Sequence, residues 1–179
     1  MFARARLDHY AQAGLTVPES LREFTKARLA GRVTKTSYAT PPTEVIQRTF
    51  DRVTQLKTED PVCYLAFWLA VGAGLRRGEI NRLDWSHVVD RADGTWISGG
   101  IGKDGERIEV PIQARAVAAL EPFRKPAGRV MTSSCKMWSR RFGRWMAGLG
   151  WATQKKVHEL RAYIGSLIYQ RDPVAAMRF

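Results

Sequence analysis

The stretch "PVCYLAFWLAVGAGLRRGEI", residues 61–80, decides the fold, because a run of apolar residues stands directly before two adjacent arginines. A helix that is apolar on all sides is buried in a protein core, and Pro61 stands where a helix tolerates proline, in its first turn. Gly72 and Gly74 loosen or end this helix before Arg76. The stretch therefore predicts a central core helix with fixed positive charge at its end.

Composition favours a soluble, globular protein with a polyanionic partner. The chain has 179 residues, 45% of them hydrophobic, which is enough for one domain with a substantial core. The 29 Lys and Arg against 17 Asp and Glu give a formal charge of +12, and such a surface attracts nucleic acid. The longest apolar segment is shorter than the ~20 residues that span a bilayer, and no secretory signal is visible. We expect a cytoplasmic protein that does not bind membranes.

Cys63 and Cys135 stand far apart, with no CxxC spacing and no neighbouring pair of histidines. This pattern argues against a zinc site and against a disulfide framework. We expect two buried thiols, no metal and a reducing compartment.

The pattern along the chain predicts mainly helices with one small sheet. Two Asp-Gly pairs, Asp93-Gly94 and Asp104-Gly105, are hairpin signals between the alternating segments "WSHVV", "TWISGGI" and "RIEVPI". Apolar residues recur at helical spacing before and after this region, in "TEVIQRTFDRVTQL", "ARAVAALEPF", "SCKMWSRRFGRWMAGLG" and "VHELRAYIGSLIYQR". The predicted fold class is mainly α with a small three-stranded antiparallel β-sheet.

Three short patterns could carry chemistry. Arg76 and Glu79 are three residues apart, so on a helical turn the carboxylate can orient the guanidinium. Lys103 stands at the tip of the second predicted hairpin, where a side chain can reach into a groove. His158 and Arg161 share one face of an otherwise apolar helix. Taken alone, each pattern has a common structural explanation. The first could be a surface ion pair, the second a solvated lysine, and the third an incidental motif.

Together and in this order, the patterns resemble the catalytic domain of the tyrosine recombinase (phage integrase) family. That family carries "GLRxxEl", then a hairpin lysine in "GKxxxxRxxPl", then "HxLR". Here these segments read "GLRRGEI", "GKDGERIEVPI" and "HELR", and "LDWSHV" is similar to the family's "LxWxDi". The resemblance covers residues 41–179.

The resemblance implies a role for each residue of the patterns. Arg76 and Arg161 would grip the scissile phosphate, and Lys103 would be the general acid that protonates the departing 5′ oxygen. His158 would be an acid/base partner beside the phosphate, and Glu79 would orient Arg76. The chemistry is DNA cleavage and rejoining through a phosphotyrosine intermediate, without metal or other cofactor. Ala162 departs from the family, which often has histidine there.

The resemblance also divides the chain. Residues 1–31 would be a remnant of a helical N-terminal core-binding domain, residues 32–42 a linker, and residues 43–179 a catalytic domain that is incomplete at its C-terminal end. The family's nucleophilic tyrosine follows the second arginine by roughly thirty residues, more than the 179 − 161 = 18 residues present. We expect Tyr64, Tyr163 and Tyr169 to be structural, no nucleophile in this chain, and DNA binding without cleavage.

A basic helix adds a predicted DNA-binding surface. The segment "CKMWSRRFGRW" places cations on neighbouring faces of one helix, either as a solvated basic face or as a helix in a DNA groove. The predicted DNA contacts are Lys136, Arg140, Arg141, Arg144, Lys155 and Lys156. Double-stranded DNA is thus the expected partner. Family members assemble as tetramers on DNA, whereas we expect this chain alone to be a monomer.

Two other functions remain open at this point. One is a non-catalytic DNA-binding regulator with an integrase-like fold. The other is a basic RNA- or ribosome-binding module in which the arginine motifs are accidental.

Overall fold

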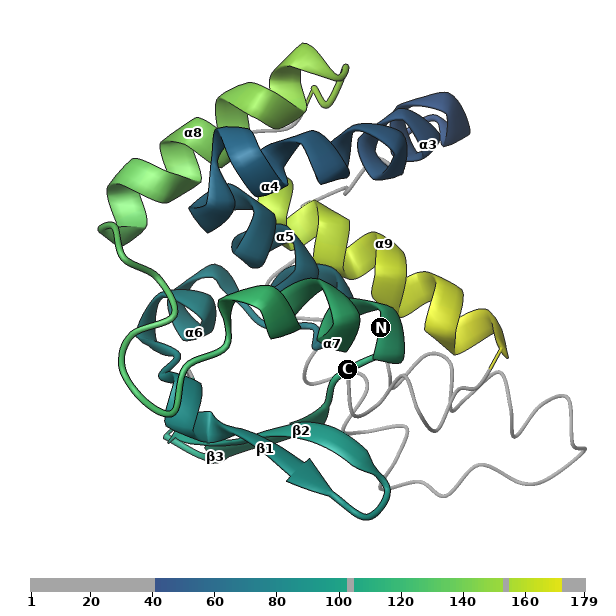
Figure 1. The fold of residues 1–179 in the computed structure, drawn as a ribbon. Coiled ribbons are helices and arrows are strands. Elements are labelled where there is room, and N and C mark those ends of the chain that lie inside the picture. Colours follow the sequence, from purple (N-terminus) through teal and green to yellow (C-terminus); the bar gives the residue numbers. More distant parts are fainter. Residues whose placement is uncertain (1–40, 103–104, 153–154, 172–179) are drawn as a thin grey trace, which may run out of the picture. The chain divides into compact units, whose positions relative to one another are not determined.

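The computed structural model describes residues 41–102, 105–152 and 155–171, which lie in one compact unit, Ala39–Phe179. The predicted remnant at residues 1–31 and most of the predicted linker lie outside the described residues. The described elements are α3 (Thr43–Arg52), η1 (Val53–Gln55), α4 (Leu56–Glu59), α5 (Pro61–Gly72), α6 (Arg77–Arg82), η2 (Trp85–His87), β1 (Val88–Arg91), β2 (Gly94–Ile101), β3 (Arg107–Pro111), α7 (Ala114–Leu120), η3 (Glu121–Phe123), α8 (Cys135–Gly148) and α9 (Lys156–Arg171). The predicted fold class is confirmed (Figure 1).

Helix α5 is the centre of the core, as the opening stretch predicts. The Asp60 carboxylate caps the helix by accepting a hydrogen bond from the backbone N–H of Cys63 (3.2 Å), and Pro61 occupies the first turn. Every residue from Cys63 to Gly72 is buried. Helices α4, α7, α8 and α9 all contact α5 (Figure 1). Each large apolar side chain buried there contributes about 1.5–3 kcal/mol, so α5 anchors whatever follows it.

Helix α7 lies very close to the end of α5. A Cβ at Gly72 would stand 2.1 Å from the Cβ of Ala116, so only glycine fits. The N–H of Gln113 donates to the carbonyl oxygen of Gly72 (2.9 Å). Since α7 also contacts β2, this close approach ties the sheet to the end of α5 where Arg76 follows.

The sheet has the order β1-β2-β3, with both pairs antiparallel. The first hairpin turns through Ala92 and Asp93, between the paired residues Arg91 and Gly94, which confirms the predicted hairpin at this place. The second pair is irregular between Ser98 and Ile101, where Gly99 and Gly100 have φ of 132° and 75°. These left-handed conformations suit glycine and bend the strand locally.

The predicted first strand begins later than its sequence pattern indicates. Trp85–His87 forms a 3₁₀ turn, and the strand starts at Val88. The reason is local capping, because the Asp84 carboxylate accepts hydrogen bonds from the N–H of Ser86 (3.0 Å) and from its hydroxyl (2.7 Å). Such side-chain bonds compete with strand pairing.

Candidate functional site

Arg76 lies just outside a helix and is not part of α5. After α5 the chain turns through Gly74, whose φ of 63° requires glycine, and the N–H of Leu75 donates to the carbonyl of Leu69 (3.3 Å). Arg76 is the extended residue that precedes α6, with φ −73° and ψ 154°. The expectation of an Arg76–Glu79 pair within one helical turn is therefore corrected: Arg76 precedes the helix and Glu79 lies in its first turn.

Glu79 holds Arg76 at two points. One carboxylate oxygen accepts from the Arg76 backbone N–H (2.7 Å) and the other from its Nη1 (3.0 Å). The first bond is the backbone half of a capping box, in which the third residue of a helix reaches back to the residue before it. Glu79 is 7% exposed and the Arg76 side chain 45%. A buried carboxylate thus fixes a guanidinium that remains accessible to an anion.

Arg161 reaches the same turn from α9. Its Nε donates to the carbonyl oxygen of Gly74, so α9 is fastened to the segment between α5 and α6. Burial lowers the pKa of Arg161, the nearby positive charge of Arg76 lowers it further, and Glu79 opposes both effects. Two cations held this close repel each other, and an anion between them relieves that repulsion. The arrangement suits an anion with several oxygens.

His158 stands one turn before Arg161 on α9 and is exposed. Partial desolvation lowers its pKa, and the positive charges of Arg161, Lys155 and Arg76 lower it further, against a weaker effect of Glu159. The imidazole is therefore neutral at neutral pH, with one nitrogen donating and the other accepting. A bound anion would raise this pKa by offsetting the surrounding positive charge.

The second hairpin points toward the same place. A Cβ added at Gly102 would lie 3.9 Å from Oε1 of Glu79, and the N–H of Gly102 donates to the carbonyl of Glu106 (2.8 Å). Lys103, the next residue, lies outside the described residues, so its role stays a prediction. The structure thus brings together Arg76, Glu79, His158 and Arg161, with the described end of the hairpin beside Glu79.

The predicted DNA contacts on α8 fall into two kinds. Lys136, Arg140 and Arg144 are exposed, and they line a shallow hollow of about 310 Å³ together with Arg141 and Met137. Arg141 has an intramolecular partner, since its Nε and Nη2 donate to the Asp60 carboxylate (2.6 and 3.2 Å). A DNA role for Arg141 remains a prediction, and the ion pair fixes α8 to the start of α5.

Sequence reasoning missed two features of this region. The Asp60–Arg141 pair joins residues far apart in the chain, and no sequence pattern marks it. Arg77, to which the motifs assign no role, is exposed and lines a pocket with Gly143, Lys155 and Lys156. In the sequence, the feature that could have indicated this pocket is Gly143, a glycine inside the basic helix α8.

Two kinds of feature are absent from the described part of the chain. No group of three or more His, Cys, Asp or Glu side chains there is placed to hold a metal ion. Within the same residues, no helix is both long enough and apolar enough to cross a membrane.

Comparison with known proteins supports the fold. No protein-family model and no curated protein matches the chain. Among solved structures, the chain is similar to a lambda integrase fragment crystallised as a dimer bound to a COC′ core site, with a TM-score of 0.57 and 21% identity over 99% of this chain and 76% of that one. A second lambda integrase structure, bound to DNA, gives 0.54 and 19% over 95% and 71%. The chain therefore has the fold of these lambda integrase fragments, as its motifs predict.

Proposed function

We propose that this chain is the catalytic domain of a tyrosine site-specific recombinase. The observation that carries the proposal is the convergence of Arg76 and Arg161 from distant segments, each fixed by an acceptor of the fold, Glu79 or the Gly74 carbonyl. Two further observations support the proposal. The motifs that contain these arginines resemble those of the integrase family, and the fold is similar to two DNA-bound integrase structures.

The geometry suits phosphoryl transfer. As a tyrosine oxygen bonds to phosphorus and the bond to the 5′ oxygen breaks, negative charge gathers on the non-bridging oxygens. Guanidinium forks match these oxygens better than point charges, and donors that are already fixed need no reorganisation. Lys103 would donate the proton to the departing 5′ oxygen. His158, neutral at neutral pH, would hydrogen-bond the phosphate and exchange a proton there.

The nucleophile is not assigned to a described tyrosine. Tyr64 is buried in α5, where its ring packs on Trp68 and Phe123 with centroids 6.3 and 5.8 Å apart. Tyr163 is partly buried against the core. With the family's spacing as the further ground, we propose that these 179 residues bind DNA without cleaving it, and that cleavage uses a tyrosine from outside them.

The test supplies that tyrosine. The chain is extended with a C-terminal segment that carries the tyrosine, and a matched protein carries phenylalanine instead. Each is mixed with a nicked suicide duplex, chosen from a random pool by binding to the chain. We expect a covalent protein–DNA adduct with tyrosine and none with phenylalanine. DNA binding without any adduct would instead support a non-catalytic regulator, and preference for structured RNA over duplex DNA would support the RNA-binding function.

Assembly follows from the same proposal. We expect the 179-residue chain to be monomeric by light scattering, and the extended protein to form a tetramer on paired duplexes. A stable oligomer of the chain without DNA would contradict this expectation.

A further inference from the structure

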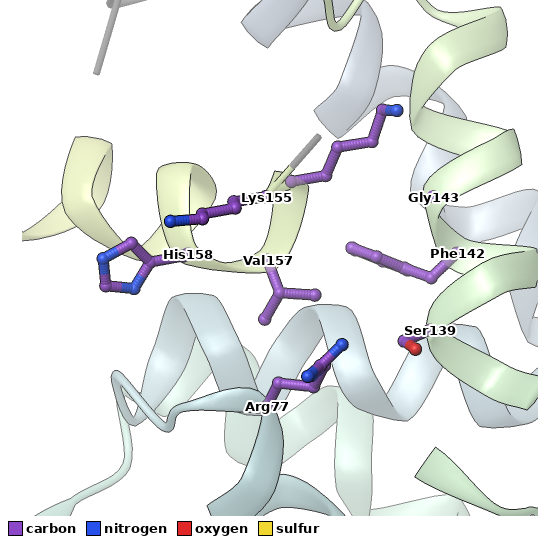
Figure 2. A pocket seen from close by; sticks show the side chains of 8 residues that line it. Arg77, Ser139, Phe142, Gly143, Lys155, Val157 and His158 are labelled. Atoms are coloured by element: carbon purple, nitrogen blue, oxygen red, sulfur yellow. The ribbon is translucent and has the colours of Figure 1, made fainter. Parts of the chain in front are cut away.

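A second basic pocket lies next to the proposed catalytic residues, between α6, α8 and the start of α9. Its volume is about 420 Å³. Figure 2 shows Arg77 on one side, Ser139 and Phe142 of α8 on another, and Val157 and His158 of α9 opposite. The complete lining is Arg77, Ser139, Phe142, Gly143, Lys155, Lys156, Val157 and His158.

The lining is cationic around an apolar floor. Arg77, Lys155 and Lys156 supply positive charge, and Phe142 and Val157, 0% and 8% exposed, close the bottom. None of these lining residues is acidic. Lys155 and Lys156 also stand at the start of α9, where the helix dipole is positive and a cation is unfavourable. Such a concentration of positive charge favours an anionic ligand.

Gly143 leaves room for that ligand. Within a helix, glycine costs about 1 kcal/mol relative to alanine, and such a glycine usually allows another group to approach closely. At Gly143 no such group is present, because a Cβ there would meet nothing within 4 Å. The wall of the pocket is therefore open at the point where a side chain would project from α8.

His158 joins this pocket to the catalytic cluster. It lines the pocket, and the positive charges of Arg161, Lys155 and Arg76 all act on its imidazole. The side chains of the consecutive residues Arg76 and Arg77 lie at different sites. Arg76 pairs with Glu79, whereas Arg77 lines the pocket. A ligand that occupies both places must carry more than one anionic group along a chain.

We propose that this pocket binds a second backbone phosphate of DNA, next to the scissile phosphate, through Arg77, Lys155 and Lys156. The assignment rests on the proposed function, because it takes DNA as the ligand. Arg77 thereby becomes a residue that positions the strand in register with the catalytic cluster. Gly143 keeps the pocket open for the phosphate.

The test blocks the pocket without changing its charge. Gly143→Leu places a side chain in the opening, and Gly148→Leu is the control, because Gly148 is on the same helix and a Cβ there also meets nothing within 4 Å. Affinity for a short DNA duplex is measured over a series of salt concentrations. We expect Gly143→Leu and Arg77→Gln each to lower affinity about 10-fold and to reduce the log–log salt slope by about 0.9, one phosphate contact. Gly148→Leu should match the wild type, and thermal unfolding of each variant checks its folding.

The outcomes separate this proposal from the proposed function. If Gly143→Leu binds like Gly148→Leu, the pocket proposal is overturned, even where Arg76 and Arg161 variants lose adduct formation. If Arg77→Gln weakens binding and Gly143→Leu does not, Arg77 acts as diffuse surface charge and the pocket proposal is again overturned. If both pocket variants reduce the slope while adducts form without Arg76 and Arg161, the pocket stands and the catalytic assignment falls.

Discussion

The molecule places its cations in two different ways. Arg76 and Arg161 are held by acceptors of the fold, a buried carboxylate and a backbone carbonyl. Lys136, Arg140 and Arg144 project from the surface of α8. The held cations keep one geometry before any ligand arrives, whereas the exposed ones must lose side-chain freedom on binding. We infer that the first group determines chemistry, and that the second group determines how strongly DNA is attracted.

The largest expected effect tests the geometry of the held group. Arg76→Lys and Arg161→Lys keep the charge and lose the guanidinium fork. In the protein extended with the tyrosine segment, each should slow adduct formation by roughly 100- to 1000-fold, while DNA affinity changes by less than about 3-fold. The rate on the suicide duplex measures this. Arg140→Lys is the matched control. An equal loss of adduct rate in this variant would mean that the held and exposed cations do not differ in function.

The next effect tests whether Arg76 depends on the Glu79 carboxylate that holds it. Glu79→Gln removes the charge that fixes Arg76 and turns an amide donor toward its N–H groups. We expect a loss of about 10-fold in adduct rate, the size of one charge-assisted hydrogen bond of about 1.5 kcal/mol. Glu59→Gln, an exposed carboxylate on α4, should leave the rate unchanged. A normal rate in Glu79→Gln would show that Arg76 needs no support.

Substitutions of the exposed arginines on α8 should change DNA binding and leave the adduct rate unaltered, the opposite of the result expected for Arg76 and Arg161. Arg140→Gln with Arg144→Gln should reduce the log–log salt slope of DNA binding by roughly 2, because each phosphate contact contributes about 0.9. The adduct rate at saturating DNA should not change. Arg52→Gln with Lys57→Gln removes the same charge from exposed positions on α3 and α4. If this control lowers the slope equally, total charge and not α8 explains the attraction.

The smallest effect concerns Arg141, which sequence places with the exposed group and structure fastens to Asp60. Their side chains are 35% and 20% exposed, so the pair contributes only about 0.5–1 kcal/mol. Asp60→Asn keeps the cap on α5 and should cost that amount, whereas Asp60→Ala also removes the cap and should cost about 2 kcal/mol. Urea unfolding at neutral pH measures both.

The pH dependence of the same pair has a definite sign. Burial raises the pKa of Asp60, but hydrogen bonds from Arg141 and Cys63 outweigh it, so the pKa is lowered. The contribution is therefore complete above the ordinary pKa of an aspartate and is lost as pH falls through the lowered value. The difference between wild type and Asp60→Asn should close in acid. If the difference in unfolding free energy between wild type and Asp60→Asn persists in acid, the negative charge of Asp60 does not cause it.

Much of this fold follows from local pattern. The uniformly apolar run before Arg76 predicts α5, and the Asp93-Gly94 pair predicts the first hairpin; the structure contains both. The 3₁₀ turn at Trp85–His87 does not follow from alternation, because the capping of Ser86 by Asp84 overrides it.

The sequence predicts which side chains lie together near Arg76, but it does not predict how they are held. The ordered motifs identify Arg76, Glu79, His158 and Arg161, but spacing alone suggests a pair within a helix where the chain has an extended residue before one. The carbonyl of Gly74 as the partner of Arg161 depends on packing of distant elements. Backbone acceptors have no sequence signature, so such contacts appear only in three dimensions.

The bond from Arg161 to the Gly74 carbonyl spans 87 residues, and this separation orders events during synthesis. A growing chain that ends before α9 already contains Arg76 and Glu79 but cannot close the pair of arginines. Contacts between distant residues form late because loop closure must come first. If the proposed function holds, the nascent protein attracts DNA through its charge well before Arg76 and Arg161 can hold a phosphate together.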